Sequence, residues 1–237
     1  MTEKKERIAK IMAAAGLCSR RDAERWITAG RVIVNGKTLT TPACVIGSDD
    51  SVIVDGKPLG NKQPRRVWCY HKPAGLITTN RDPQGRPTIF EKLPPSLPRV
   101  VTVGRLDFNS EGLLLLTTDG GLARELELPQ KAWKRKYRVR VHGTVTPEVI
   151  KRLSQGVRIK DISYAPCHLE IERVQNTNTW VLITLTEGKN REIRRLMDFF
   201  GLPVTRLIRV SYGPFQLGNL PAGSVREIPQ KTLKELL

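Results

Sequence analysis

The sequence predicts an α+β protein of two domains: a small domain of helices and β-hairpins over residues 4–63, and a larger, strand-rich domain over residues 64–237. Three observations support this division. Apolar side chains recur at helical spacing in residues 7–30, and two short β-branched runs with turn dipeptides follow in residues 31–59. Longer strand-like runs dominate the rest of the chain. Between the two patterns lies GNKQPRR, residues 60–66, a polar segment with Gly and Pro that is typical of a linker.

The composition favours a polyanionic partner. The 237 residues include 40 Lys and Arg against 23 Asp and Glu, which gives a formal net charge of +17 at pH 7. Such a surplus repels itself unless a polyanion neutralises it, so we expect a nucleic acid as partner. An anionic membrane is the rival. The sequence has no apolar run of about 18 residues and no signal peptide, and we therefore expect a cytoplasmic protein without a membrane partner.

The cysteines and histidines predict no metal site. Cys18, Cys44, Cys69 and Cys167 are scattered and form no CxxC pair, and the three histidines show no ligand spacing. We expect free thiols in a reducing cytoplasm.

Two short helices are predicted in the first domain. Residues 7–16 carry apolar side chains at i, i+3, i+4 and i+7, and Gly16 is placed to end that helix. Ser19 caps the second helix with Asp22 three residues later in an approximate capping box, and Gly30 ends it. This helix should bury Ala23, Trp26 and Ile27 and turn three arginines outward, Arg20, Arg21 and Arg25.

Two β-hairpins follow the helices. The Asn35-Gly36 pair in RVIVNGKTL is a strong signal for a type I′ turn, and a similar run, VIVDGKPL, appears about twenty residues later. An internal repeat would explain the similarity, but the flanking residues do not match. We favour two hairpins whose β-branched residues converge on similar letters.

The larger domain alternates strands with a few helices. The run GLLLLTTDG, residues 112–120, is apolar on both faces and predicts a fully buried strand. In RKYRVRVHG, residues 135–143, Tyr137 shares one face with two valines, and basic side chains occupy the other. Further strands are predicted at 66–79, 99–106, 179–188 and 204–217, and helices at 122–128 and 189–201, the last with Ile193, Leu196, Met197 and Phe200 as its buried stripe.

Asp107 occupies the loop between two of these strands. A carboxylate held between core strands is positioned rigidly, as catalytic groups are. Two alternatives stay open at this point: Asp107 caps a turn, or it pairs with Arg105. Asp107 and Glu111 also resemble the carboxylate pair of a glycosidase, but such pairs come from different elements and only 5% of the residues are aromatic.

Several motifs in the sequence resemble those of a known protein family. GRLDFNSEGLLLLTTDG closely resembles the signature of the RsuA/RluB-type pseudouridine synthases, and KPAGLITTNRDPQGRPTIF, KRKYRVRV, TEGKNREIRRL and RLIRVSYGP resemble further blocks of that family in the same order. SRRDAERWITAGRVIVNGK resembles the S4 RNA-binding module. The likeness covers essentially the whole chain and is greatest to the branch that modifies large-subunit ribosomal RNA.

The resemblance implies a fold, a reaction and a set of roles. The fold would be a mixed, mostly antiparallel central sheet flanked by helices, and the isomerisation of uridine would need neither cofactor nor metal. Asp107 would be the single catalytic carboxylate. Tyr137 would stack on the target base, Arg194 would pair with the Asp, Leu207 would form an apolar wall, and Arg105 would hold the flipped nucleotide. Glu192 stands where the family often has Gln.

RNA contacts are expected on both domains, from Arg20, Arg21, Arg25, Arg31 and Lys37 in the first and from Lys189 and Arg195 in the second. The expected partner is large-subunit ribosomal RNA or its assembly precursor, bound by a monomer. The alternative is a non-catalytic S4-type RNA-binding or ribosome-assembly protein, in which Tyr137 and Leu207 are ordinary core and Arg194 is a solvated cation.

Overall fold

The computed structural model describes residues 5–128 and 133–237. It divides into two compact units. The first comprises the chain up to Arg66 with residues 96–101 and 117–121, and the second comprises the remainder. Residue 4, the expected start of the first domain, lies outside the described residues. No helix in the described part of the chain is long and apolar enough to cross a membrane.

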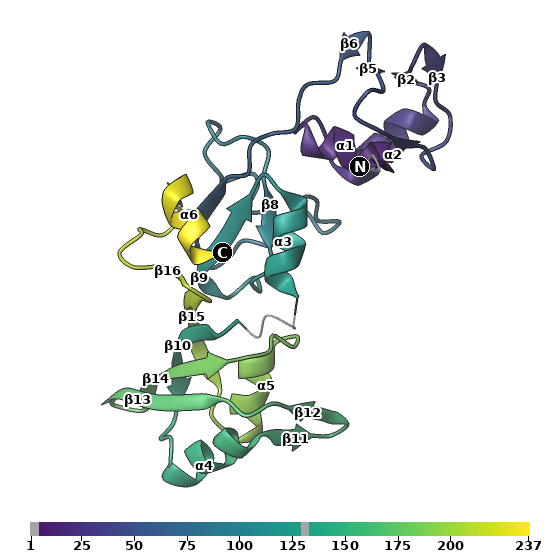
Figure 1. Cartoon of the computed structure of the whole chain (residues 1–237). Helices are drawn as coiled ribbons and strands as arrows, with labels where there is room; N and C mark the ends of the chain where they lie inside the picture. The colour runs from purple at the N-terminus through teal and green to yellow at the C-terminus, as the bar shows by residue number, and fades with distance from the viewer. Residues whose placement is uncertain (1–4, 129–132) are drawn as a thin grey trace. The chain divides into compact units, whose positions relative to one another are not determined.

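Two helices begin the first unit. They are α1, Ile8–Ala14, and α2, Arg20–Thr28 (Figure 1). Ser19 caps α2 as predicted: its hydroxyl accepts a hydrogen bond from the Asp22 amide at 3.0 Å, and the reciprocal contact completes the capping box. Trp26 is only half-buried, contrary to the prediction. It packs against the core of this unit, and the Arg31 guanidinium lies 4.4 Å from its ring centre.

Both predicted hairpins form. Strands β2, Val32–Val34, and β3, Lys37–Thr38, enclose Asn35 and Gly36, whose φ values of 49° and 78° meet the requirement of the turn. Strands β5, Val52–Val54, and β6, Lys57–Pro58, form the second hairpin, and β2 pairs antiparallel with β5. A short pair, β1, Glu6–Arg7, and β4, Val45–Ile46, completes the unit.

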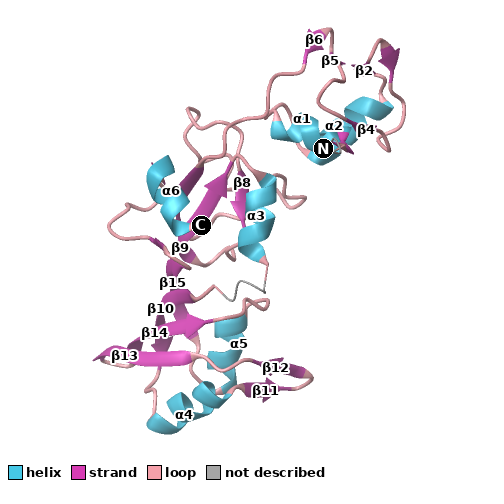
Figure 2. Ribbon diagram, in the orientation of Figure 1, coloured by secondary structure: helices cyan, strands magenta, loops and turns pink. Residues whose placement is uncertain are grey.

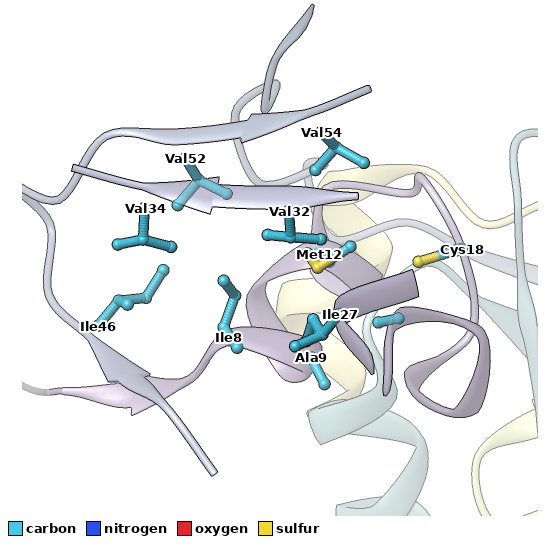
Figure 3. Close-up of a cluster of buried hydrophobic side chains, with 11 residues drawn as sticks. Ile8, Ala9, Met12, Cys18, Ile27, Val32, Val34, Ile46, Val52 and Val54 are labelled. Carbon is cyan, nitrogen blue, oxygen red and sulfur yellow. The ribbon is translucent and has the colours of Figure 1, made fainter. Parts of the chain in front are cut away.

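This unit has its own hydrophobic core. Figure 3 shows side chains from both helices and from β2, β4 and β5 pointing toward one another. The hairpins contribute equivalent valines, Val32 and Val34 from one and Val52 and Val54 from the other. Their similar letters therefore reflect similar positions on one sheet face.

One mixed sheet organises the second unit (Figure 2). Its order is β13-β14-β10-β15-β9-β7-β17, with β16 paired to β15 and β8 to β9. The strands are β7 Val67–Lys72, β8 Val101–Val103, β9 Glu111–Thr117, β10 Arg135–His142, β13 His168–Gln175, β14 Asn178–Leu185, β15 Val204–Tyr212, β16 Phe215–Gln216 and β17 Val225–Glu227. The separate hairpin is β11 Val157–Ile159 and β12 Ile162–Tyr164, and the helices are α3 Gly120–Glu127, α4 Pro147–Gln155, α5 Glu192–Phe199 and α6 Gln230–Leu236. The predicted fold class, a mostly antiparallel sheet flanked by helices, is confirmed.

Several element boundaries differ from the predictions. The strand expected over 66–79 ends at Lys72, because Pro73 has no amide hydrogen to donate and Gly75 turns the chain at a φ of 82°. The helix expected from residue 189 begins at Glu192, and Phe200 is half-buried at its end. The sequence analysis identified none of α4, α6, β11, β12, β13 and β17.

The buried strand β9 joins the sheet through a parallel contact. Its four leucines, Leu113 to Leu116, are fully buried, as predicted. Gly112 lies opposite Arg209 of β15 in the parallel register. A Cβ at Gly112 would lie 2.3 Å from the Arg209 carbonyl oxygen, so only glycine allows the two backbones to approach this closely. This contact brings the loop before β9 next to β15.

Candidate active site

The second unit contains a cavity of about 730 Å³ next to this loop. Its lining comes from residues 104–110, from 77–86 and 188–193, and from side chains of β10 and β15. Asp107, Arg105, Tyr137 and Leu207, which come from three separate parts of the sequence, all line it. Arg194 and Arg195 are not among the lining residues.

The Asp107 loop rests on a buried lysine. Lys72 is 0% exposed, and its Nζ donates hydrogen bonds to the carbonyl oxygens of Asp107 at 3.1 Å, Ser110 at 2.8 Å and Pro73 at 3.0 Å. Burial lowers the pKa of Lys72 to about 8, while the charges of Asp107 and Glu111 oppose that shift. Sequence reasoning missed this residue, although it lies in the quoted KPAGL block.

The Asp107 carboxylate has no hydrogen-bond donor or ion-pair partner among the described residues. The backbone of its loop is nevertheless tied down, since Ser110 N donates to the Asp107 carbonyl at 3.0 Å and Thr78 Oγ1 donates to the Leu106 carbonyl at 2.9 Å. A fixed backbone and a free carboxylate are what a reacting group requires.

Two side chains from neighbouring strands form the floor of the cavity. Tyr137 on β10 lies opposite Arg209 of β15, and Val139 lies opposite Leu207 in the same register. Because residues directly opposite each other share a sheet face, Tyr137 and Leu207 lie on the same side of the sheet. Tyr137 is buried, and it lines the cavity.

Arg194 contacts the backbone of the Asp107 loop. Arg194, expected to pair with Asp107, donates through Nη2 to the carbonyl of Asn109 at 3.0 Å and through Nη1 to the carbonyl of Val204 at 3.3 Å. No ion pair between Arg194 and Asp107 is present in the described part of the chain. Burial lowers the pKa of Arg194, and the Asp107 charge opposes that change. Arg194 therefore braces the loop backbone in this structure.

Arg209 of β15 is a further cation at the cavity, which it lines from the sheet. It is 3% exposed, and its Nε donates to the Leu113 carbonyl at 2.7 Å. Its Nη2 is buried without a hydrogen-bond partner, so the guanidinium keeps an unsatisfied N–H donor in a residue that lines the cavity. Sequence reasoning missed Arg209. The signal was its position two residues after Leu207, on the same face of the same strand.

Glu111 does not form a carboxylate pair with Asp107. Arg206 donates to both Glu111 oxygens at 2.9 Å, and this contact lowers the pKa of the Glu111 carboxyl. Glu111 is therefore engaged by an arginine, which argues against the glycosidase arrangement.

The segment before α5 forms another wall of the cavity. Lys189 Nζ donates to the Ser163 carbonyl at 2.8 Å, and the Lys189 amide donates to Glu192 Oε2 at 2.8 Å. Burial raises the pKa of Glu192 to about 7. Arg195 is exposed and donates to Asn190 Oδ1 at 3.2 Å.

The other expected RNA-binding residues lie in the first unit. Arg20, Arg21 and Lys37 are exposed. Arg25 forms an ion pair with Asp22, and Arg31 donates to both carboxylate oxygens of Asp55. The positive charge of each of these two arginines is therefore partly neutralised by a carboxylate of the same unit.

The cysteines are free in the structure. The described residues contain no group of three or more His, Cys, Asp or Glu side chains arranged to hold a metal ion.

Comparisons with known proteins identify relatives of this chain. Residues 66–198 match the family model "RNA pseudouridylate synthase", and residues 6–52 match the S4 domain. The chain is 46% identical to an uncharacterized RNA pseudouridine synthase of Rickettsia typhi, over 98% of this chain and 95% of that protein. It is 43% identical to the ribosomal large subunit pseudouridine synthase B of Yersinia pestis, over 98% of this chain and 76% of that protein. A crystal structure of a pseudouridylate synthase superimposes with a TM-score of 0.69 at 25% identity and covers 98% of this chain and 99% of that one.

Proposed function

The chain belongs to the RNA pseudouridylate synthase family, with an S4 domain before the catalytic domain, and from this premise we propose that it isomerises a uridine of large-subunit ribosomal RNA with Asp107 as the reacting carboxylate. The observation that carries the assignment of Asp107 is its free carboxylate on the cavity wall, close to the floor that Tyr137 and Leu207 form. The choice of large-subunit RNA is supported by the names of the relatives from Yersinia pestis and Salmonella typhi.

The reaction explains why these side chains lie together. The N1–C1′ bond of uridine breaks, the base turns, and C5 joins C1′; C5 loses a proton and N1 regains one, so no oxidant or reductant is needed. A helix hides these atoms, so the nucleotide must first be flipped out at a cost of a few kcal/mol. Tyr137 offers an aromatic surface to the base, and Leu207 excludes water beside it.

Asp107 acts at the sugar. Attack on C1′ and abstraction of a sugar proton both need an ionised carboxylate with a free oxygen. Arg209 contributes donors that suit the substrate's phosphate or carbonyl oxygens. Arg194 positions the loop through the Asn109 carbonyl, and Arg105, exposed at the cavity, contacts the flipped nucleotide.

RNA outside the cavity is bound by both units in this proposal. Arg20, Arg21 and Lys37 supply phosphate contacts from the first unit, Arg25 and Arg31 add to them, and Lys189 and Arg195 act beside the cavity. Action as a monomer in the cytoplasm, without a cofactor, belongs to the same proposal. The non-catalytic alternative gives no reason to keep an unpaired carboxylate on the cavity wall.

The test is conversion of uridine in transcripts of large-subunit ribosomal RNA, mapped at single-nucleotide resolution with a pseudouridine-specific reagent. We expect one strongly modified position with the wild-type protein and none with Asp107→Asn, which keeps the shape and removes the ionisable group. RNA affinity should stay nearly unchanged. Comparable conversion by the Asn variant would refute the assignment of Asp107, and modification only of other RNA classes would refute the proposed substrate.

A further inference from the structure

The sheet of the second unit has a second face, turned away from the cavity. On β10, Lys136, Arg138 and Arg140 alternate with Tyr137 and its buried neighbours. The register places Arg140 opposite Trp180 of β14 and Arg138 opposite Leu182, so these side chains share that face. β13, β14 and β10 lie side by side in Figure 1.

Three guanidinium groups gather around one indole ring on this face. The Cζ atoms of Arg138, Arg140 and Arg173 lie 4.6, 5.8 and 5.9 Å from the centre of the Trp180 ring. Trp180 sits on the middle strand, with Arg173 on one side and the other two arginines on the other. Trp180 is only 5% exposed, so the arginine side chains cover it and are themselves held in place.

This cluster carries more positive charge than its neighbours neutralise. Arg138 Nε donates to Glu172 at 2.7 Å. Arg140 Nε donates to the neutral Thr205 hydroxyl at 2.8 Å. In the described part of the chain, neither Arg140 nor Arg173 has a carboxylate within 4.0 Å.

The remaining acidic groups on this face are already engaged. Glu170 accepts a hydrogen bond from His168, and that contact together with the Lys136 charge lowers its pKa. Arg206 lies on the same face, but both its contacts go to Glu111. A net positive charge therefore remains on Arg140 and Arg173, which flank Trp180 from β10 and β13.

We propose that these side chains, Lys136, Arg138, Arg140 and Arg173, which we call the arginine face, form a second RNA-binding surface that contacts phosphates of the substrate RNA outside the flipped nucleotide. The proposal rests on the proposed function only in taking RNA as the substrate. Guanidinium groups held on a flat sheet present paired N–H donors that match phosphate oxygens. The Trp180 ring is covered by the arginines and offers no surface for a base, so the contacts are to the RNA backbone and do not read bases.

The test is the salt dependence of RNA binding by the full-length protein. The double variant R140Q/R173Q should bind a transcript of large-subunit ribosomal RNA about tenfold more weakly at low salt. The slope of log K against log salt should become shallower by about 1.4–1.8, which corresponds to the loss of two phosphate contacts. The matched control is K231Q/K234Q, which removes the same charge from exposed positions on α6. An equal change in slope for both double variants would show that the arginine face only adds diffuse charge, and the proposal would fail.

A second variant, E172Q, tests the proposal by an expected gain in binding, which loss of folding could not produce. E172Q removes the carboxylate that pairs with Arg138 and frees this arginine, so it should strengthen RNA binding and steepen the slope by about 0.7–0.9. Unchanged binding by E172Q would overturn the proposal. So would weaker binding of R140Q/R173Q to a ribosomal particle with normal binding to protein-free RNA, because the partner would then be a protein. Binding is measured without turnover, so absence of uridine conversion by the wild-type protein would refute the proposed function alone.

Discussion

Below pH 7 the side chain of Glu192 should carry a proton, and Glu192→Gln should therefore change how stability depends on pH. Glu192 is 3% exposed, and its Oε1 is buried without a hydrogen-bond partner. The titratable groups that face it are Glu187 and Lys189 from the preceding segment and the Cys167 thiol. Burial and the Glu192 charge raise the pKa of that thiol to about 11. Glu187 in turn accepts hydrogen bonds from Lys189 Nζ at 2.5 Å and from the Ala165 amide at 2.8 Å.

Burial is the main cause that raises the pKa of Glu192 from 4.5 to about 7. The Glu187 charge acts in the same direction, and the Lys189 amide and ammonium oppose it. A proton on Glu192 would give Oε1 a hydrogen to donate, and the neighbouring Glu187 carboxylate is an acceptor. The two carboxyl groups then titrate as a pair that holds one proton.

The sign and size of the effect follow from these values. Because the pKa is higher in the folded than in the unfolded state, the stabilisation is complete below pH 4.5 and is lost as pH rises through 7. The shift corresponds to about 3 kcal/mol in total, most of which falls between pH 5 and pH 8. Glutamine cannot ionise, so the Glu192→Gln variant should lack this decline.

The assay is urea unfolding at pH 5, 6, 7 and 8, with the difference between the two proteins plotted against pH. Titrating groups that do not interact with Glu192 cancel in that difference. Glu235→Gln, at an exposed position on α6, serves as the control and should give a flat line. Because residues 188–191 line the cavity, uridine conversion by the wild-type protein should also decline more than that of the variant above pH 7. A flat difference line for Glu192→Gln would show that Glu192 is ionised throughout, and the reasoning would be refuted.

Two further predictions follow from the lysine under the loop and from the first unit. Lys72→Met should lower the free energy of unfolding by about 1–3 kcal/mol in chemical denaturation, because the buried loop carbonyls lose their donor. The control is Lys92→Met, a substitution at an exposed position. Equal losses for the two variants would contradict the structural role of Lys72. Removal of residues 1–62 should leave a folded protein that binds ribosomal RNA more weakly and with a smaller dependence on salt. Its single-turnover rate at saturating protein should be near normal, measured with the large-subunit transcript used above. A soluble, folded truncation that is inactive at every concentration would mean that the S4 domain shapes the active site.

Local patterns in the sequence were sufficient for much of the framework. The Ser19 cap, the Asn35-Gly36 turn and the alternation around Tyr137 depend on residues a few positions apart, and each is present in the structure. The run of leucines after Asp107 predicted a buried strand for the same reason. The motif around Asp107 also indicated the family to which the chain belongs, because the motif is long and almost uninterrupted.

Boundaries and short elements were less predictable. β13 is largely exposed along its length and lacks the alternation of a half-buried strand, so only its pairing with β14 defines it. The strand ending at Lys72 and the late start of α5 at Glu192 depend on single backbone features, Pro73 and the left-handed Arg191 with a φ of 52°. The spacing of apolar residues along the sequence does not predict such backbone features.

The sequence by itself therefore determined the two-domain order, the family and the candidate carboxylate, because these depend on local patterns and on motif letters. Tertiary structure alone decided what surrounds that carboxylate. Lys72 reaches the Ser110 carbonyl from 38 positions away, and Arg209 reaches the Leu113 carbonyl from 96 positions away. These contacts exist only because β9 pairs in parallel with β15 and β7 lies beside β9 in the same sheet. Strand order and burial set the partners and the charge of such groups, and neither property is encoded in the residues next to them along the chain.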